Sequence, residues 1–179
     1  MIREATPADA AACAAVYAPY VTDSIISFEL RAPTASEFQQ RMRAAHLWLV
    51  AEEAGEICGY AYGSAHRERE AYRWAADVAI YVERSHQGRG LGRALYTRLF
   101  DGLRDRGFCV LCAGVALPNP ASEALHRSLG FSEVGVYRRI AFKFGEWIDT
   151  RWYQLELQPR SQPPPDTVVR GRDETARSM

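Results

Sequence analysis

The sequence has no excess of charge of either sign and no long apolar run. Lys plus Arg equals Asp plus Glu at 22 each, so charge does not favour bulk attraction to nucleic acid or to a membrane surface. No apolar stretch approaches the roughly 20 residues that span a bilayer, and the first residues, "MIREATPADA", lack the apolar region of a signal peptide. We therefore expect a cytoplasmic protein that binds neither nucleic acid nor membrane.

Cysteine is also scarce, and the four that occur do not form an obvious site: Cys13, Cys58, Cys109 and Cys112. The pair in "CVLC" suggests a redox or zinc motif, but side chains three apart on a strand point to opposite faces. No second close pair completes a zinc site. We expect four reduced thiols in or near the core, and no bound metal.

The rest of the composition is that of a globular domain. Hydrophobic residues make up 47% and charged residues 25% of 179 residues, and a chain of this length most often forms one domain. We place that domain at residues 1–159. Residues 160–179 are rich in Pro, Arg and Ser and have little apolar surface to bury, so we expect a disordered C-terminal tail there.

Apolar patterns and capping residues together predict an α/β fold. Thr6 with Asp9, and Thr34 with Glu37, have the spacing of capping boxes, so a helix is expected to follow each pair. The chain is predicted to run β-α-α-β-β-β-α-β-α-β-β. Meander strands followed by strand–helix–strand–helix require a mixed sheet, here an α+β arrangement of about seven strands flanked by about four helices.

Glycine is concentrated in "YVERSHQGRGLGRALY", between a predicted strand and a predicted helix. Its spacing does not match the dinucleotide pattern GxGxxG, and the GK[ST] of a P-loop is absent. The pattern Q-x-x-G-x-G does match, at Gln87, Gly90 and Gly92. Bare backbone at a helix N-terminus directs several N–H groups, and the positive end of the helix dipole, at one place. The segment therefore predicts a site for a pyrophosphate.

The loop from Gln87 to Gly92 resembles the acetyl-coenzyme A loop of the GNAT N-acetyltransferases. Asn119, Ser122 and His126, with "LGF" after them, stand where that family usually has an Asn, a small residue, a Tyr and a Gly-Phe. The order of elements also resembles the family's fold over residues 1–158. The resemblance implies the GNAT acyltransferase fold, with acetyl-coenzyme A (acetyl-CoA) as co-substrate.

A closer similarity is to one branch of that family, the phosphinothricin and methionine sulfoximine N-acetyltransferases. The shared marks are "SFE", "WLVAE", "AYRW", "YV", "LH" and "FKFGEWIDTRWYQL". The resemblance implies a homodimeric enzyme that acetylates the α-amine of a small amino acid analogue, such as phosphinothricin, methionine sulfoximine or methionine sulfone. The sequence departs from the branch at Asp77, where a Glu is usual. Because Asp is shorter by one methylene, a bridging water is expected there.

The resemblance assigns the acetyl-CoA contacts to three segments. Main-chain N–H groups around residues 80–82 are expected to stabilise the oxyanion, and Asn119 and Ser122 to bind the pantetheine arm. Alternatively, Asn119 and Ser122 serve only to cap a helix, and Arg89 and Arg93 are solvated charges rather than phosphate ligands. The predicted set is Ile80, Tyr81, Val82, Gln87, Gly88, Arg89, Gly90, Leu91, Gly92, Arg93, Asn119 and Ser122.

Two residues are predicted to carry out the chemistry. An amine must be neutral to attack a thioester, so Asp77, in the otherwise apolar strand "WAADVAIYV", is the predicted general base. The alternative is an edge carboxylate paired with Arg67, Arg69 or Arg73. His126 is predicted to give a proton or a hydrogen bond to the leaving thiolate. The alternative is a histidine that packs on its helix.

The acidic head of the acceptor is expected at the loop "HREREAYR", because a guanidinium fork suits a carboxylate or phosphinate. The alternative is an exposed loop of alternating charges. The predicted substrate-binding set is Phe28, Glu29, Arg67, Arg69, Tyr72 and Lys143. Two other functions remain open: acetylation of protein N-termini, which needs an open groove, and non-catalytic acetyl-CoA sensing, which could dispense with Asp77 and His126.

Overall fold

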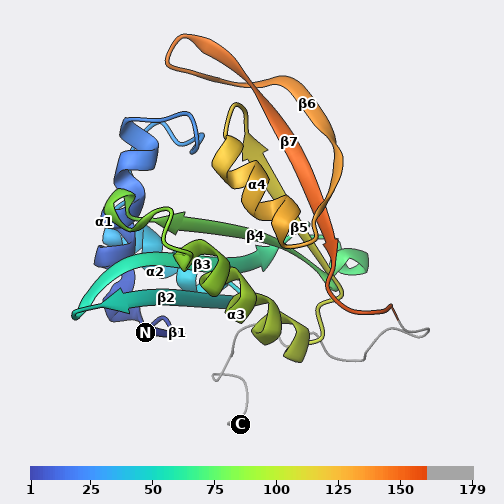
Figure 1. The fold of residues 1–179 in the computed structure, drawn as a ribbon, viewed down its shortest axis with the longest axis horizontal. Helices are drawn as coiled ribbons and strands as arrows, with labels where there is room; N and C mark the ends of the chain where they lie inside the picture. The colour runs from blue at the N-terminus through green and yellow to red at the C-terminus, as the bar shows by residue number, and fades with distance from the viewer. Residues whose placement is uncertain (161–179) are drawn as a thin grey trace, which may run out of the picture.

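The computed structural model describes residues 1–160 as one seven-stranded sheet with helices on both faces (Figure 1). The strand order is β1-β2-β3-β4-β5-β7-β6. The strands are β1 Ile2–Glu4, β2 Leu47–Glu53, β3 Glu56–Ala65, β4 Ala75–Val82, β5 Val110–Ala116, β6 Ser132–Lys143 and β7 Glu146–Glu156. The α-helices are α1 Ala10–Thr22, α2 Ala35–Ala44, α3 Leu91–Asp105 and α4 Pro120–Ser128. This confirms the predicted element order; the predicted tail, apart from its first residue, lies outside the described residues.

The first two helices begin at the capping residues that the sequence marks. The Thr34 hydroxyl accepts the Glu37 backbone N–H at 3.3 Å, and the Glu37 carboxylate accepts the Thr34 N–H at 2.6 Å. The Asp9 carboxylate likewise accepts the Thr6 N–H at 2.7 Å. A 3-10 turn follows Thr6, so α1 proper begins only at Ala10. Both arrangements satisfy N–H groups that a helix cannot pair internally.

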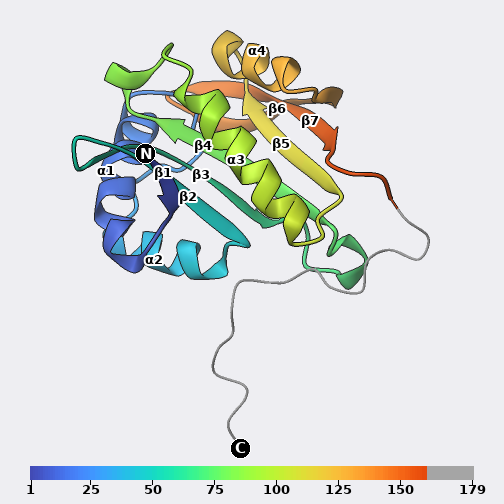
Figure 2. The same cartoon turned by 60° about the horizontal axis from the view of Figure 1, so that its bottom comes forward.

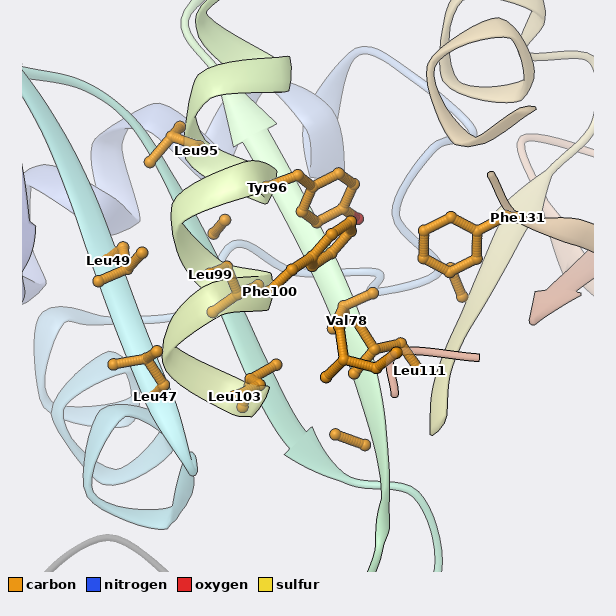
Figure 3. Close-up of a cluster of buried hydrophobic side chains, with 14 of the residues drawn as sticks. Leu47, Leu49, Val78, Leu95, Tyr96, Leu99, Phe100, Leu103, Leu111 and Phe131 are labelled. Carbon is orange, nitrogen blue, oxygen red and sulfur yellow. The ribbon is translucent and has the colours of Figure 1, made fainter. Parts of the chain in front are cut away.

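Two apolar clusters hold the helices on opposite faces of the sheet. Leu47 and Leu49 of β2 belong to the cluster under α3, and the alternate residues Trp48 and Val50 belong to the cluster under α1 and α2. Figure 2 shows α3 lying across the sheet. Its contribution to the core is Leu95, Tyr96, Leu99, Phe100 and Leu103, labelled in Figure 3. Each fully buried leucine contributes roughly 1.5–3 kcal/mol to folding.

The central strands β4 and β5 form the single parallel pair among the described strands, and they soon diverge. They pair only where Ala75–Asp77 lies beside Val110–Cys112. Beyond that point β4 continues along β3, and β5 continues along β7. Where β4 and β5 no longer pair with each other, the main-chain N–H and C=O groups on their facing edges remain available to other partners. This divergence creates the candidate site.

Two expectations about the chain as a whole can be compared with the fold. Within residues 1–160, no helix is long and apolar enough to cross a membrane. The cysteines carry free thiols, buried at Cys13, Cys58 and Cys109 and half-buried at Cys112. Their placement in and near the core is as predicted.

Candidate active site

A narrow cleft of about 60 Å³ lies where β4 and β5 diverge. The predicted residues that line it are Ile80, Tyr81, Asn119, Ser122 and His126. The cleft thus brings the main chain of β4 together with the first turns of α4. The unpaired part of the β4 edge supplies main-chain hydrogen-bonding groups to one side of the cleft.

The glycines of the loop before α3 lie in two different structural settings. Gly88 and Gly90 have φ angles of +72° and +82°, and a Cβ atom added at either would meet no atom within 4 Å. Glycine there permits a left-handed backbone and leaves open space above the loop. At Gly92, an added Cβ would lie 3.4 Å from the Leu125 side chain and 3.5 Å from that of Ile80. Gly92, the second residue of α3, thus lies where α3 packs against α4, and a Cβ atom there would make only ordinary van der Waals contacts.

The Gln87 side chain holds the loop in place through hydrogen bonds. Its side-chain amide donates to the Tyr20 hydroxyl at 2.8 Å and to the Val82 carbonyl at 3.2 Å. The Tyr20 hydroxyl also donates to the Val82 carbonyl and accepts the Val82 N–H at 3.3 Å. Tyr20 therefore links α1, the end of β4 and the loop. Sequence reasoning missed it, because an apolar helix pattern does not mark one tyrosine as reaching a distant strand.

The two arginines of the loop differ in their freedom. Arg93 donates to the Ser128 hydroxyl at 2.7 Å and is thereby tied to the end of α4. Arg89 makes a loose ion pair with Glu53 at 3.6 Å, and its side chain is 59% exposed. An exposed pair of this kind is weak. Arg89 is therefore the better placed of the two to contact a phosphate.

Helix α4 is fixed at both its cap and its side. The Asn119 side chain accepts the Ser122 N–H at 3.2 Å, which confirms the predicted helix cap. The Glu123 carboxylate accepts hydrogen bonds from Arg151 and Tyr153 of β7. These contacts hold the first turns of α4 against the sheet beside the cleft.

His126 lies in the wall of the cleft and is 2% exposed. Burial lowers the pKa of His126, against a smaller opposing effect of the Ser122 carbonyl, so the ring is neutral at pH 7. Its Nδ1 donates to that carbonyl at 2.8 Å. Nε2 then carries a lone pair and accepts from the Tyr96 hydroxyl at 3.3 Å. Tyr96, which the sequence did not single out, also lines the cleft.

Asp77 stands where β4 and β5 are still paired, in register with Ser64 of β3 and Cys112 of β5. Its carboxylate oxygen lies 2.7 Å from Nδ1 of His66. Burial raises the pKa of the Asp77 carboxyl, and the His66 hydrogen bond acts in the opposite direction. The hydrogen-bonding partner is therefore a histidine, and not one of the three arginines that the alternative proposed.

A second cavity, of about 340 Å³, lies beside this carboxylate. Its lining includes His66, Arg67 and Cys112, together with Tyr137 and Trp152 of the β6–β7 hairpin. Cationic and aromatic groups thus surround a space of small-molecule size. Arg67 is the predicted acceptor-binding arginine that lies at this cavity.

The rest of the predicted acceptor loop surrounds His66. Tyr72 is 45% exposed, and its ring stands edge-on to the imidazole with the ring centres 5.8 Å apart. Arg69 is exposed and precedes a short 3-10 helix, where its carbonyl accepts the Tyr72 N–H at 3.0 Å. Arg69 therefore does not share the position of Arg67.

Glu29 organises the segment between α1 and α2. Its carboxylate accepts two hydrogen bonds from Arg41, at 2.6 and 2.9 Å, and one from Tyr17 at 3.0 Å. Although burial acts to raise it, the pKa of the Glu29 carboxyl is lowered by these donors. Phe28, its neighbour, is 41% exposed. Of these two predicted acceptor-binding residues, Phe28 is the one whose side chain is exposed.

Lys143 occupies a position unlike that expected of an acceptor-binding residue. Its ammonium group is buried and donates to three main-chain carbonyls of the α1–α2 segment: Val21 at 2.6 Å, Ser24 at 3.0 Å and Ser27 at 2.7 Å. Burial lowers the pKa of Lys143, against the smaller effect of the Glu29 charge. Because an ammonium has three N–H donors, none remains for a substrate carboxylate. The prediction for Lys143 is corrected accordingly.

Two groups of side chains in the described residues bring possible metal donors within 4.8 Å of one another. One is His66, Asp77 and Cys112, and the other is Glu53, Cys58 and His86. Burial raises the pKa of both thiols, to about 11 for Cys112. Metal binding would have to displace those protons. We interpret both groups as hydrogen-bonded clusters, and the absence of a metal stays a prediction.

The fold, the glycine loop and the divergent strands together define an acyltransferase of the GNAT kind. Residues 2–152 match the acetyltransferase (GNAT) domain family, and the chain belongs to this family. It is an acetyl-CoA-dependent N-acetyltransferase.

Individual relatives cover nearly the whole chain. A phosphinothricin N-acetyltransferase of Streptomyces viridochromogenes is 35% identical over 92% of this chain and 91% of its own. A methionine sulfoximine and methionine sulfone acetyltransferase of Salmonella typhimurium is 34% identical over 90% of this chain and 97% of its own. The crystal structure of a phosphinothricin acetyltransferase of Sinorhizobium meliloti with acetyl-CoA superposes with a TM-score of 0.87, at 30% identity, covering 96% and 98% of the two chains.

Proposed function

We propose that the protein acetylates the α-amine of a small amino acid analogue of the phosphinothricin, methionine sulfoximine or methionine sulfone type. The observation that carries the proposal is the 340 Å³ cavity, where Arg67 lies beside the His66–Asp77 pair. Its volume falls within the roughly 300–1,000 Å³ of small-molecule sites. The names of the relatives above support the same class of acceptor.

Each part of the site is assigned a role in acetyl transfer. The loop at the N-terminus of α3 binds the pyrophosphate of acetyl-CoA through backbone N–H groups. The main chain of β4 near Ile80 and Tyr81 stabilises the oxyanion. The Asp77 site removes the proton from the acceptor's ammonium group. The Tyr96 hydroxyl, which His126 Nε2 holds in the cleft, turns from that nitrogen to give its hydrogen bond to the leaving thiolate.

A panel of acceptors tests the function directly. The purified protein is incubated with acetyl-CoA and with phosphinothricin, methionine sulfoximine, methionine sulfone, the free protein amino acids or short peptides, and released coenzyme A is measured. We expect the highest kcat/KM among the three analogues. A preference for short peptides would overturn the proposal in favour of protein N-terminal acetylation, and inactivity with every amine would favour the sensor.

Arg67 should determine selectivity within this panel. A guanidinium that pairs with the acidic head of the acceptor contributes about 1.5–3 kcal/mol, so Arg67→Gln should lower kcat/KM for phosphinothricin roughly 10- to 150-fold. Neutral small amines should be affected much less. Arg69→Gln removes the same charge from the same loop and is the matched control. Equal losses in both variants, or equal losses for every acceptor, would contradict a directed contact at Arg67.

We further propose that the enzyme is a homodimer that pairs through the β6–β7 hairpin. Exposed apolar side chains gather on this hairpin, which Figure 1 shows extending along one side of the molecule. They are Tyr137, Ile140, Phe142, Phe144 and Trp147, each between 53% and 59% exposed. Exposed apolar side chains grouped on one hairpin favour burial against a partner, and a two-fold axis lets the hairpin pair with its own copy.

A further inference from the structure

The carboxylate assigned as the base does not itself face the acceptor cavity. Among the described residues, those around the 340 Å³ cavity include His66 and Arg67 but not Asp77. We propose that His66, held by Asp77, is the group that takes the proton from the acceptor's ammonium, so that Asp77 acts through an Asp–His pair. This inference rests on the proposed function and names a further catalytic residue within it.

The register of the sheet places the two side chains together. Asp77 of β4 lies opposite Ser64 of β3. Side chains two residues apart on an extended chain share a face, so His66, directly after the end of β3, lies on the same face as Ser64 and Asp77. The result is the 2.7 Å contact between Nδ1 and the carboxylate.

The orientation of the imidazole ring leaves its other nitrogen available. Because Nδ1 is bound to Asp77, Nε2 lies at the far edge of the ring, and nothing within residues 1–160 forms a hydrogen bond with it. The ring stands edge-on to Tyr72, at 5.8 Å between centres, and to Trp152, at 6.4 Å. These aromatic rings limit the directions in which the imidazole can turn. The His66 side chain is 16% exposed and belongs to the lining of the cavity.

This arrangement suits a base that works near neutral pH. The carboxylate accepts the Nδ1–H, which fixes the tautomer with a lone pair on Nε2 and stabilises the imidazolium that forms. An imidazole titrates closer to neutral pH than a carboxyl group does, and a base is most effective when it titrates near the working pH.

The proton and electron balance can be followed through the reaction. Nε2 takes one proton from the ammonium, and the neutral amine then attacks the acetyl carbonyl carbon. The C–N bond forms, the C–S bond breaks, and its electron pair leaves on sulfur. The remaining extra proton on nitrogen passes to the thiolate, and the imidazolium returns its proton to water. The products are the N-acetyl compound, coenzyme A and one proton.

Several groups surround the imidazole. Asp77 of β4 is its hydrogen-bonding partner, and Arg67 is the cation next to it in the same loop. Cys112 of β5 and Tyr72 complete the surroundings. Burial, and then the Asp77 charge, raise the pKa of Cys112 to about 11, so its thiol stays neutral in the working range. The pH dependence therefore belongs to the Asp77–His66 pair as a unit.

Substitutions of His66 can distinguish a role as the base from a role that only positions Asp77. His66→Asn places an amide N–H near the place of Nδ1, so it keeps the hydrogen bond to Asp77 but has no counterpart of Nε2. His66→Ala removes both. If His66 is the base, both variants lose about 10²-fold or more in kcat, with acetyl-CoA affinity unchanged. Near-wild-type activity in His66→Asn, with loss only in His66→Ala, would overturn the inference.

The experiment is run on the acceptor that the wild type uses best in the panel, across a pH series. Asp77→Asn, His66→Asn and the double variant should show nearly equal losses, because residues that act as a unit are not additive. The acid limb of the kcat/KM profile should disappear in His66→Asn and shift in Asp77→Asn. If the loss in the double variant equalled the product of the two single losses, the proposal that Asp77 and His66 act as a pair would be overturned. A wild type that acetylates no amino acid analogue would instead overturn the proposed function, and this inference with it.

A measurement on the wild type covers the case in which the variants do not fold. The nitrogen NMR signals of the His66 ring should show the proton on Nδ1 and a bare Nε2 that titrates, and addition of methionine sulfone should shift the Nε2 signal. A protonated Nε2 with a bare Nδ1, or an Nε2 signal insensitive to the acceptor, would overturn the inference.

Discussion

At the scale of single residues, Lys143 is the most instructive side chain. It is the sole lysine among the 22 basic residues counted as Lys plus Arg. A compact ammonium can direct its N–H groups at three carbonyls that converge on one point, which a planar guanidinium fork cannot do. Lys143 at the end of β6 thereby fixes the turn after α1, next to Ser27.

Replacing Lys143 should therefore destabilise the fold. Lys143→Met leaves the three carbonyls without their charged donor and should lower the free energy of unfolding by roughly 1.5–3 kcal/mol. Lys143→Arg should recover only part of the loss. Arg138→Met, on the same strand but with a side chain 81% exposed, is the control and should change little. Urea unfolding measures the stability of all three variants. Equal stabilities for Lys143→Met and Arg138→Met would contradict a stabilising role for the hydrogen bonds of Lys143.

The same scale shows why some site residues could be predicted and others could not. The Asn119 cap depends on residues a few positions apart, and local spacing predicted it. The contact of His66 with Asp77 depends on the register of β3 against β4, which no local pattern specifies. The sequence did not indicate that an imidazole would lie against the Asp77 carboxylate. Lys143 failed as a prediction for a similar reason, since its partners lie more than 100 residues away in the chain.

At the scale of elements, the loop before α3 combines two demands on glycine. Local geometry needs a left-handed backbone, and the proposed pyrophosphate site needs open space above the loop. These demands can be separated, because Gly55, in the turn between β2 and β3, has φ +86° and equally open surroundings but no role in the site. Its left-handed backbone matches that of Gly90, at φ +82°.

Gly90→Glu should abolish acetyl-CoA binding while the protein stays folded. The new side chain would fill the open space above the loop with a negative charge, where the pyrophosphate is expected. Gly55→Glu introduces the same charge and a similar backbone strain, which costs on the order of 1 kcal/mol of stability. It should not affect acetyl-CoA binding. Calorimetric titration with acetyl-CoA distinguishes the two, and unchanged affinity in a folded Gly90→Glu protein would contradict the assignment.

The element order itself was predictable, because periodicity and capping are local properties. Thr34 with Glu37 marked the start of α2, and the glycines marked the start of α3. The divergence of β4 from β5 was not visible in either strand's sequence. It shows only in the pairing: β4 pairs with the first residues of β5, whereas β7, on the opposite edge of β5, pairs along all of it from Val110 to Ala116.

At the scale of the whole molecule, the β6–β7 hairpin carries an apolar surface that the monomer does not bury. Phe142 and Trp147 are register partners with ring centres 5.3 Å apart, and both remain more than half exposed. Ile140 and Phe144, on the same hairpin, are also more than half exposed. The sequence alone, read through its resemblance, predicted a homodimer but did not indicate which surface would form it.

A charge placed in this surface should separate the subunits. Wild-type protein, a chain of 20.1 kDa, should sediment at twice that mass. Trp147→Glu removes a large aromatic contact from each subunit and, by symmetry, puts two carboxylates into an apolar interface. The dissociation constant of the dimer should therefore rise at least about tenfold, which corresponds to ~1.4 kcal/mol. Gln40→Glu adds the same charge on the exposed side of α2 and should leave the mass unchanged. Analytical ultracentrifugation over a concentration series decides between the outcomes. A wild type that is monomeric at every concentration would contradict the dimer, and a dimer that survives Trp147→Glu would place its interface on another surface.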